Sequence, residues 1–293
     1  MPIDLLKIFF LSFGILLTSG LALAQDPDMQ LSAKPLADGE EPKKYRLLLG
    51  AEFASDLPGD NPRHMFQAIF SYQLSEKIGL SAIQRLRQRI YLSEHENRFD
   101  IDDTILSASY ALGQYYELNH SIRADMTLPI SLDSRENETY TSLSLMYSAG
   151  HQPFEKTFLS YGLSASSFLA RYRSSASGSS GGGGIAGPVY SFGFFSMGSY
   201  NWTERLRTNY FLINSRTWYY DLSPDKASAG VSSIPDDSFF VNLSMSYALN
   251  DYLQFASGLR KGNLISELSL IDFAIFDGEL NQYFFSLNYS TSF

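Results

Sequence analysis

The sequence predicts an all-β fold, a single transmembrane antiparallel up-and-down β-barrel. Apolar and polar residues alternate along most of the chain, short and long connections alternate between the predicted strands, and aromatic residues are abundant, with 19 Tyr and 22 Phe among 293 residues. Only every second residue of a barrel strand faces lipid, so such a barrel keeps a modest hydropathy. The mean hydropathy of −0.12 agrees with this and argues against a bundle of membrane helices. The length suits one folded domain.

The longest apolar run of the sequence stands near its N-terminus. Lys7 precedes the apolar segment 8–17, and Ala22-Leu23-Ala24 then provides a small-residue cleavage site. This pattern is typical of a secretory signal peptide, so residues 1–24 are expected to be cleaved before the barrel folds. An uncleaved membrane anchor is the alternative, although the run is shorter than the ~20 residues of a spanning helix.

The segment after the cleavage site differs from the rest of the chain. Residues 25–43 are polar and contain three prolines, so we expect a flexible N-terminal tail there. The strand pattern begins at residue 44, which leaves 44–293 for the barrel.

The composition excludes several classes of protein. The chain has no cysteine, so it has neither a disulfide framework nor a thiolate metal site, and no lipidated cysteine follows the signal. Its net charge of −9 gives no support for binding nucleic acid.

Period-two alternation is clearest in segment 116–130. Leu118, Ile122 and Met126 fall on one face there, whereas Arg123 and Asp125 fall on the other. Ten and fourteen strands are the alternative counts, because in three of the segments the alternation of outward and inward residues is ambiguous. The count we predict is twelve strands, each long enough for the ~9–11 residues of a tilted membrane strand, at 44–54, 63–74, 77–91, 103–112, 116–130, 139–149, 157–171, 188–201, 205–219, 238–249, 252–262 and 281–293.

The connections between these strands alternate in length, which is the signature of transmembrane barrels. An even number of strands places both termini at the same end, where the short turns lie. Segment 263–280 has apolar residues at helical spacing, and it is expected to form either a short helix over the mouth or an extended hairpin. The tight turns are predicted at 75–77, 113–115, 202–204 and 250–251, with a slightly longer one at 150–156. The long loops are predicted at 55–62, 92–102, 131–138, 172–187, 220–237 and 263–280.

The chain ends in the sequence Tyr289-Ser290-Thr291-Ser292-Phe293. This segment resembles the C-terminal β-signal of bacterial outer-membrane proteins in its alternating Tyr289, Thr291 and Phe293, although it lacks the glycine that is usual in that signal. The resemblance implies a location in the outer membrane of a Gram-negative bacterium. It also implies contact with outer-membrane lipid and lipopolysaccharide, and recognition by the barrel-assembly machinery during insertion.

Charged residues are expected on the inner face of the barrel. If Leu80 and Leu86 face lipid, the arginines of segment 77–91 face inward, where like charges repel one another unless acids compensate them. The loop connection is expected to bring Arg89 close to Asp103. The candidate pore-lining residues are Arg85, Arg87, Arg89 and Arg123, together with the acids Asp103, Glu117 and Asp125.

Two interpretations of these charges stay open. The arginines could form a basic track for anionic solutes, because a planar guanidinium suits carboxylate and phosphate groups. Twelve-stranded porins for acidic oligosaccharides use such tracks, and the similarity is one of pattern, without a shared sequence motif. In the other interpretation, arginines and acids form a salt-bridge network that fills a narrow lumen.

Catalysis has weak support in the sequence. Membrane hydrolases of barrel fold use a His-x-Ser pair on one strand face. His64, His95, His120 and His151 are followed two positions later by Phe, Asn, Ile and Pro, so the chain has no such pair. Asp102, Asp103 and His95 are the faint candidates for a protease of the omptin type, and a solvated acidic loop accounts for them better.

Metal and cofactor binding are not predicted. The chain lacks an HExxH motif and an Asp-rich calcium loop. The glycine run at 181–184 is not followed by the lysine of a phosphate-binding loop, so it indicates a loop and not a nucleotide site.

These observations favour an outer-membrane channel, a porin-like passive transporter of small solutes, with anionic solutes as the candidate class. A closed structural or interaction barrel is the first alternative, and a membrane hydrolase is the second. An autotransporter translocator also has twelve strands, but segment 25–43 is far too short to be its passenger. The sequence identifies neither the solute nor the oligomeric state.

Overall fold

We analysed a computed structural model of the chain. It describes residues 44–56, 62–89, 99–136, 139–170, 174–175, 185–220, 235–265 and 281–293. The predicted signal peptide and N-terminal tail lie outside the described residues, as does most of segment 263–280.

The described residues form strands almost throughout. In chain order the elements are β1 (Tyr45–Asp56), β2 (Arg63–Gln73), β3 (Ile78–Arg89), β4 (Phe99–Ile101), β5 (Thr104–Tyr115), β6 (Leu118–Leu128), α2 (Leu132–Glu136), β7 (Thr139–Phe154), β8 (Thr157–Ala170), β9 (Ser174–Ser175), β10 (Ile185–Ala186), β11 (Pro188–Asn201), β12 (Leu206–Tyr219), β13 (Asp236–Ala248), β14 (Leu253–Ile265) and β15 (Asn281–Ser292).

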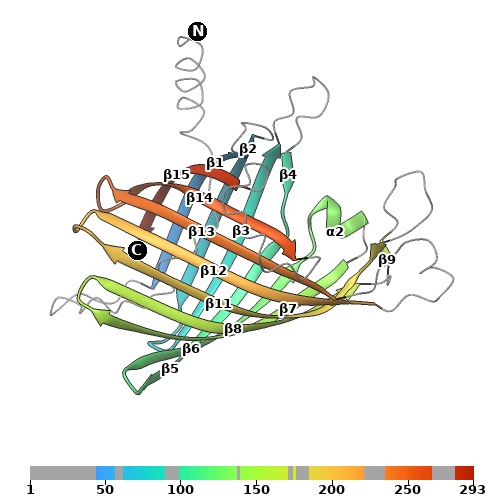
Figure 1. Cartoon of the computed structure of the whole chain (residues 1–293), viewed down its shortest axis with the longest axis horizontal. Helices are drawn as coiled ribbons and strands as arrows, with labels where there is room; N and C mark the ends of the chain where they lie inside the picture. Colours follow the sequence, from blue (N-terminus) through green and yellow to red (C-terminus); the bar gives the residue numbers. More distant parts are fainter. Residues whose placement is uncertain are drawn as a thin grey trace, which may run out of the picture.

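The strands close into an antiparallel up-and-down barrel (Figure 1). The last strand, β15, pairs with β1, and Tyr45 and Phe293 exchange backbone hydrogen bonds of 3.1 and 3.0 Å at this seam. The sheet contains thirteen strand segments, but β4 and β5 both pair with β3, one beyond the other. The barrel therefore has twelve positions around it, which confirms the predicted fold and strand count.

Two tight turns lie farther along the chain than predicted. The turn expected at 113–115 is formed by Tyr116 and Glu117, which both have positive φ (51° and 65°), and β5 continues through Gly113. Gly113 has φ 107° at a shift in register, so it forms a bulge, where a glycine avoids strain. Likewise, β7 extends to Phe154, and only residues 155–156 form the next turn.

Two of the predicted long loops carry short elements in their described parts. Segment 131–138 contains α2, a helix of five residues, and segment 172–187 contains the paired strands β9 and β10. In the described part of the chain, no helix is long and apolar enough to span a membrane.

The outer surface of the barrel is apolar. Alternate residues of each long strand are exposed hydrophobics, for example Leu143, Leu145 and Tyr147 on β7, which are 46%, 55% and 39% exposed. Aromatic residues mark the end with the short turns, where Tyr116, Trp202 and Tyr252 are 98%, 55% and 57% exposed. An apolar band bounded by aromatic rings matches a lipid-facing surface with its interfacial girdle.

Candidate functional site

The exposed apolar residues identify the inner face of each strand. On β3, Leu80 and Leu86 are exposed on the outer face, so Arg85 and Arg87 face inward. On β6, Met126 and Leu128 are exposed outside, which places Arg123 and Asp125 inside. The backbone register carries this alternation from strand to strand around the barrel.

A β-bulge separates β4 from β5 and turns two acids toward the interior. Ile105 lies opposite Ile83 of β3, but Ile101 lies opposite Leu86, so the broken strand has one residue more than its partner. The extra residue falls at Asp102 and Asp103. A bulge re-aims side chains in this way, and without it neighbouring residues point to opposite faces.

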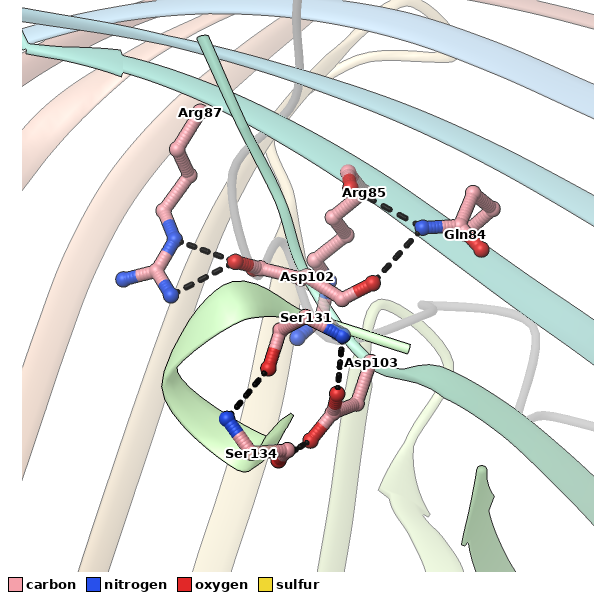
Figure 2. Close-up of polar contacts among 7 residues, drawn as sticks. All are labelled: Gln84, Arg85, Arg87, Asp102, Asp103, Ser131 and Ser134. Carbon is pink, nitrogen blue, oxygen red and sulfur yellow. Dashed lines mark hydrogen bonds and ion pairs between the residues drawn. The ribbon is translucent and has the colours of Figure 1, made fainter. Parts of the chain in front are cut away.

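Asp102 pairs with Arg87 across this bulge. Asp102 Oδ1 lies 2.5 Å from both Nε and Nη2 of Arg87, which makes a close, two-pronged contact (Figure 2). The backbone N–H of Asp102 also donates to the carbonyl of Arg85 at 3.0 Å, so the bulge is held to β3 on both sides of the ion pair.

Asp103 holds the short helix α2. Its carboxylate accepts a hydrogen bond of 2.7 Å from the backbone N–H of Ser131 and another from the hydroxyl of Ser134 (Figure 2). Burial raises the pKa of the Asp103 carboxyl, but the bonds from Ser134 and Ser131 outweigh it and hold the pKa below its ordinary value. The loop after β6 is therefore attached to the bulge by a charged acceptor.

Gln84 completes the bulge from the other face of β3. Its amide N–H₂ donates to the backbone carbonyls of Asp102 (2.8 Å) and Arg85 (3.1 Å) (Figure 2). Its amide oxygen accepts from the Thr104 hydroxyl. These bonds give partners to backbone groups that the bulge frees from the ladder.

The remaining inward arginines differ in their partners. Arg123 Nε lies 2.6 Å from Asp125, two residues along the same strand. Arg85 Nε donates to the amide oxygen of Gln67 at 3.3 Å, and Arg85 is also attracted by Asp102 and repelled by Arg87 and Arg123. We call the inner face formed by Arg85, Arg87, Asp102, Arg123 and Asp125 the charged wall. Two further acids adjoin it: Asp100, opposite Arg87 in the register, and Asp103 at the bulge.

A second ion pair, which sequence analysis missed, lies on the other side of the seam. Glu52 of β1 and Arg260 of β14 pair inside the barrel, with side chains that are 1% and 4% exposed. The Arg260 guanidinium stacks over the ring of Phe284 at 4.6 Å. The sequence signal was weak, because Glu52 is one of three charged residues of β1, with Arg46 and Asp56, that share one parity. We call Glu52, Ala54, Arg260, Phe284 and Ser286, all buried, the closed sector.

Some of the predicted pore-lining residues lie on the inner face of the barrel and others do not. The structure brings Arg85, Arg87, Arg123 and Asp125 to the inner face, and Asp102 joins them. Glu117 does not, because it lies exposed in the turn between β5 and β6. Asp103 bonds to Ser131 and Ser134 at α2, and β4 pairs with β3 from Phe99, opposite Gln88, to Ile101, opposite Leu86. The Arg89 side chain lies outside the described residues.

His120 lies among aromatic residues at the end of the barrel with the short turns. Its Nδ1 lies 2.6 Å from the Tyr147 hydroxyl and its Nε2 lies 3.2 Å from the Tyr115 carbonyl, so both ring nitrogens contact the aromatic girdle. Within the described ranges, no three His, Asp or Glu side chains gather in a way that could hold a metal ion.

Comparisons with known proteins agree with this geometry at the level of the fold. The structure is similar to the COG4313 outer membrane channel from Pseudomonas putida F1, with a TM-score of 0.57 and 11% identity over 87% of this chain and 97% of that one. It is also similar to the NanC porin, with a TM-score of 0.51 and 8% identity over 83% of this chain and 98% of that one. The chain has the fold of a bacterial outer-membrane β-barrel.

Sequence comparison adds no narrower assignment. No family model matches the chain, and none of the curated proteins matches it in sequence. At identities this low, the similarity defines the fold alone. The function of the interior depends on the residues that line it in this chain.

Proposed function

We propose that this barrel is a passive outer-membrane channel for small anionic solutes. The charged wall carries the proposal. Arg85, Arg87 and Arg123 point inward there, among the acids Asp100, Asp102, Asp103 and Asp125. Arg87 and Arg123 pair with acids, whereas Arg85 donates to the neutral amide of Gln67, so within the described residues its guanidinium has no acid in direct contact. Guanidinium groups at a pore surface attract anions and hold carboxylates through paired hydrogen bonds. The structurally similar proteins are themselves named as a channel and a porin.

Exposure inside the barrel supports a path along this wall. Arg87 keeps 41% of its side-chain surface accessible and Arg123 keeps 22%, whereas the closed sector is buried. A salt-bridge network that filled the whole interior would bury both sides alike. The closed sector favours the second candidate, a closed structural barrel, and conductance separates the two.

The test is reversal-potential measurement in planar bilayers across a KCl gradient. We expect an anion-selective current, with the preference for chloride reduced in the Arg85→Gln/Arg87→Gln variant, whose replacements are neutral. Arg205→Gln is the matched control, because Arg205 lies exposed in the turn after β11. Absence of current would favour the closed barrel. An unchanged selectivity in the arginine variant would mean that the charged wall does not determine which ions pass.

A further inference from the structure

The interior has an apolar wall as well as a charged one. Inner positions of three consecutive strands carry large apolar side chains. The neighbouring residues Phe194, Leu212 and Leu243 are exposed on the lipid face, which fixes the opposite face of each strand as internal. The apolar wall consists of Phe195 and Met197 on β11, Phe211 and Ile213 on β12, and Phe240 on β13.

The packing of this wall is well defined. Phe195 is 1% exposed, and its ring occupies the space that a side chain at Gly162 would need. Beside it, Ile213 lies opposite Phe240, and the rings of Phe211 and Phe240 lie 6.1 Å apart with a 56° tilt. Phe211, Ile213 and Phe240 are not buried, so they present apolar surface to the interior. A lumen that served only hydrated ions would gain nothing from such surface.

The two walls face each other. In the strand order around the barrel, β12 lies six positions from β3 in either direction. Arg85 is the eighth residue of β3 and Ile213 is the eighth residue of β12, and both strands begin at the end with the short turns. The guanidinium groups and the aromatic side chains therefore stand at similar heights on opposite sides of the interior.

We propose that this interior binds small carboxylates that carry an aromatic or aliphatic body, with the carboxylate on the charged wall and the body on the apolar wall. The inference rests on the proposed channel function and narrows its solute class. A guanidinium donates paired hydrogen bonds to a carboxylate, and phenylalanine rings favour contact with another apolar or aromatic group. A polyhydroxylated acid would leave hydroxyl groups facing the apolar wall without hydrogen bonds, which disfavours it.

Saturation-transfer NMR on the detergent-solubilised, full barrel tests the proposal without needing a current. Benzoate and gluconate are the two probes at pH 8, because both are monoanionic carboxylates and only benzoate has an apolar body. We expect benzoate to bind about tenfold more tightly than gluconate, the effect of covering about 50 Å² of apolar ring surface. Empty micelles measure the background.

Variants assign the binding to the two walls. Phe211→Ser/Phe240→Ser should remove the preference for benzoate, and Arg85→Gln/Arg87→Gln should weaken both probes. Leu212→Ser, on the lipid face between Phe211 and Ile213, is the control, and all variants are checked for heat-modifiable migration as a sign of folding. Equal binding of benzoate and gluconate would overturn this inference. An undiminished preference for benzoate in the phenylalanine variant would do the same. In either case a KCl current would still support the channel function. A barrel that binds benzoate but carries no current would overturn the channel function alone.

Discussion

Glu52 on β1 and Arg260 on β14 form an ion pair that spans β15 from inside the barrel, with both side chains almost completely buried. Because β1 and β15 are the first and last strands, this contact joins the two ends of the chain at the seam where the barrel closes. Within the described residues, Glu52 Oε2 and Arg260 Nε have no further hydrogen-bond partner, and the charge of Arg63 on β2 also acts on Glu52. The buried Arg260 charge therefore depends on Glu52.

Replacing Glu52 by Gln should destabilise the barrel by about 3–5 kcal/mol, because it leaves the buried Arg260 charge uncompensated. The measurement is the urea midpoint of unfolding in detergent or lipid. Arg216→Gln is the matched control, since Arg216 and Asp237 form an exposed pair of 3.0 Å, which should contribute about 0–1 kcal/mol. A Glu52→Gln/Arg260→Met variant should regain most of the loss. Equal losses in Glu52→Gln and Arg216→Gln would contradict the buried pair.

Gly162 on β8 should not tolerate a side chain. A Cβ there would overlap the Phe195 ring and the backbone carbonyl of Tyr147, and the carbonyl cannot move without disturbing the β7–β8 ladder. We expect Gly162→Ala to lower the unfolding midpoint by the equivalent of about 1–3 kcal/mol, as overpacking does. Ser164→Ala, on the same inner face, is the control and should change little. Wild-type stability of Gly162→Ala would mean that the ring is not seated over the glycine.

Much of the fold could be predicted from the sequence because the lipid imposes it. Each strand has to alternate apolar and polar residues, so β2 and β11 end within one residue of their predicted bounds. Local irregularities could not be predicted, because they depend on the register between neighbouring strands. Gly113 was expected in a turn, but the ladder continues past it as a bulge. The shape of a turn is set by the residues that take positive φ, here Tyr116 and Glu117, and neither type indicates this.

The candidate site was harder to predict than the fold. The alternation of β3 was sufficient to place Arg85 and Arg87 on one face. Their partners depended on where pairing resumes after a long connection, and the bulge that brings Asp102 to Arg87 has no signal in the sequence. Glu52 and Arg260 lie 208 residues apart, and only the closure of β15 on β1 brings them together.

The contact between Asp103 and α2 should depend on acid pH. The pKa of Asp103 is lowered in the folded chain, so its stabilising effect is complete above the unfolded value of about 3.9 and is lost as pH falls through the lower folded value. Trypsin cleavage at Arg135, which is exposed on α2, reports release of the helix. Asp103→Asn should speed this cleavage at pH 8. Its deficit in unfolding midpoint should shrink toward pH 3, where the wild-type carboxyl begins to protonate.

The control for this prediction is Asp251→Asn, which changes an exposed acid in the turn between β13 and β14. It should leave both the cleavage rate and the pH dependence as in the wild type. If Asp103→Asn behaves like Asp251→Asn, the bonds from Ser131 and Ser134 do not hold the helix.

Phe293 is expected to act in two ways, and they can be separated. Its ring stacks on Tyr45 at 5.9 Å and 17°, and its backbone pairs with Tyr45 at the seam. Phe293→Ala removes this stacking and should lower stability by about 0.5–1.5 kcal/mol. Tyr45→Ala should lower it more, because Tyr45 also contacts the rings of Phe70 and Tyr72. If the last strand is also read by an assembly machinery, Phe293→Ala should nevertheless reduce insertion in cells far more than Tyr45→Ala. Refolding from urea into detergent bypasses that machinery, and there Phe293→Ala should fold at least as well as Tyr45→Ala. Equal insertion of both variants in cells would leave Phe293 with only its structural role at the seam.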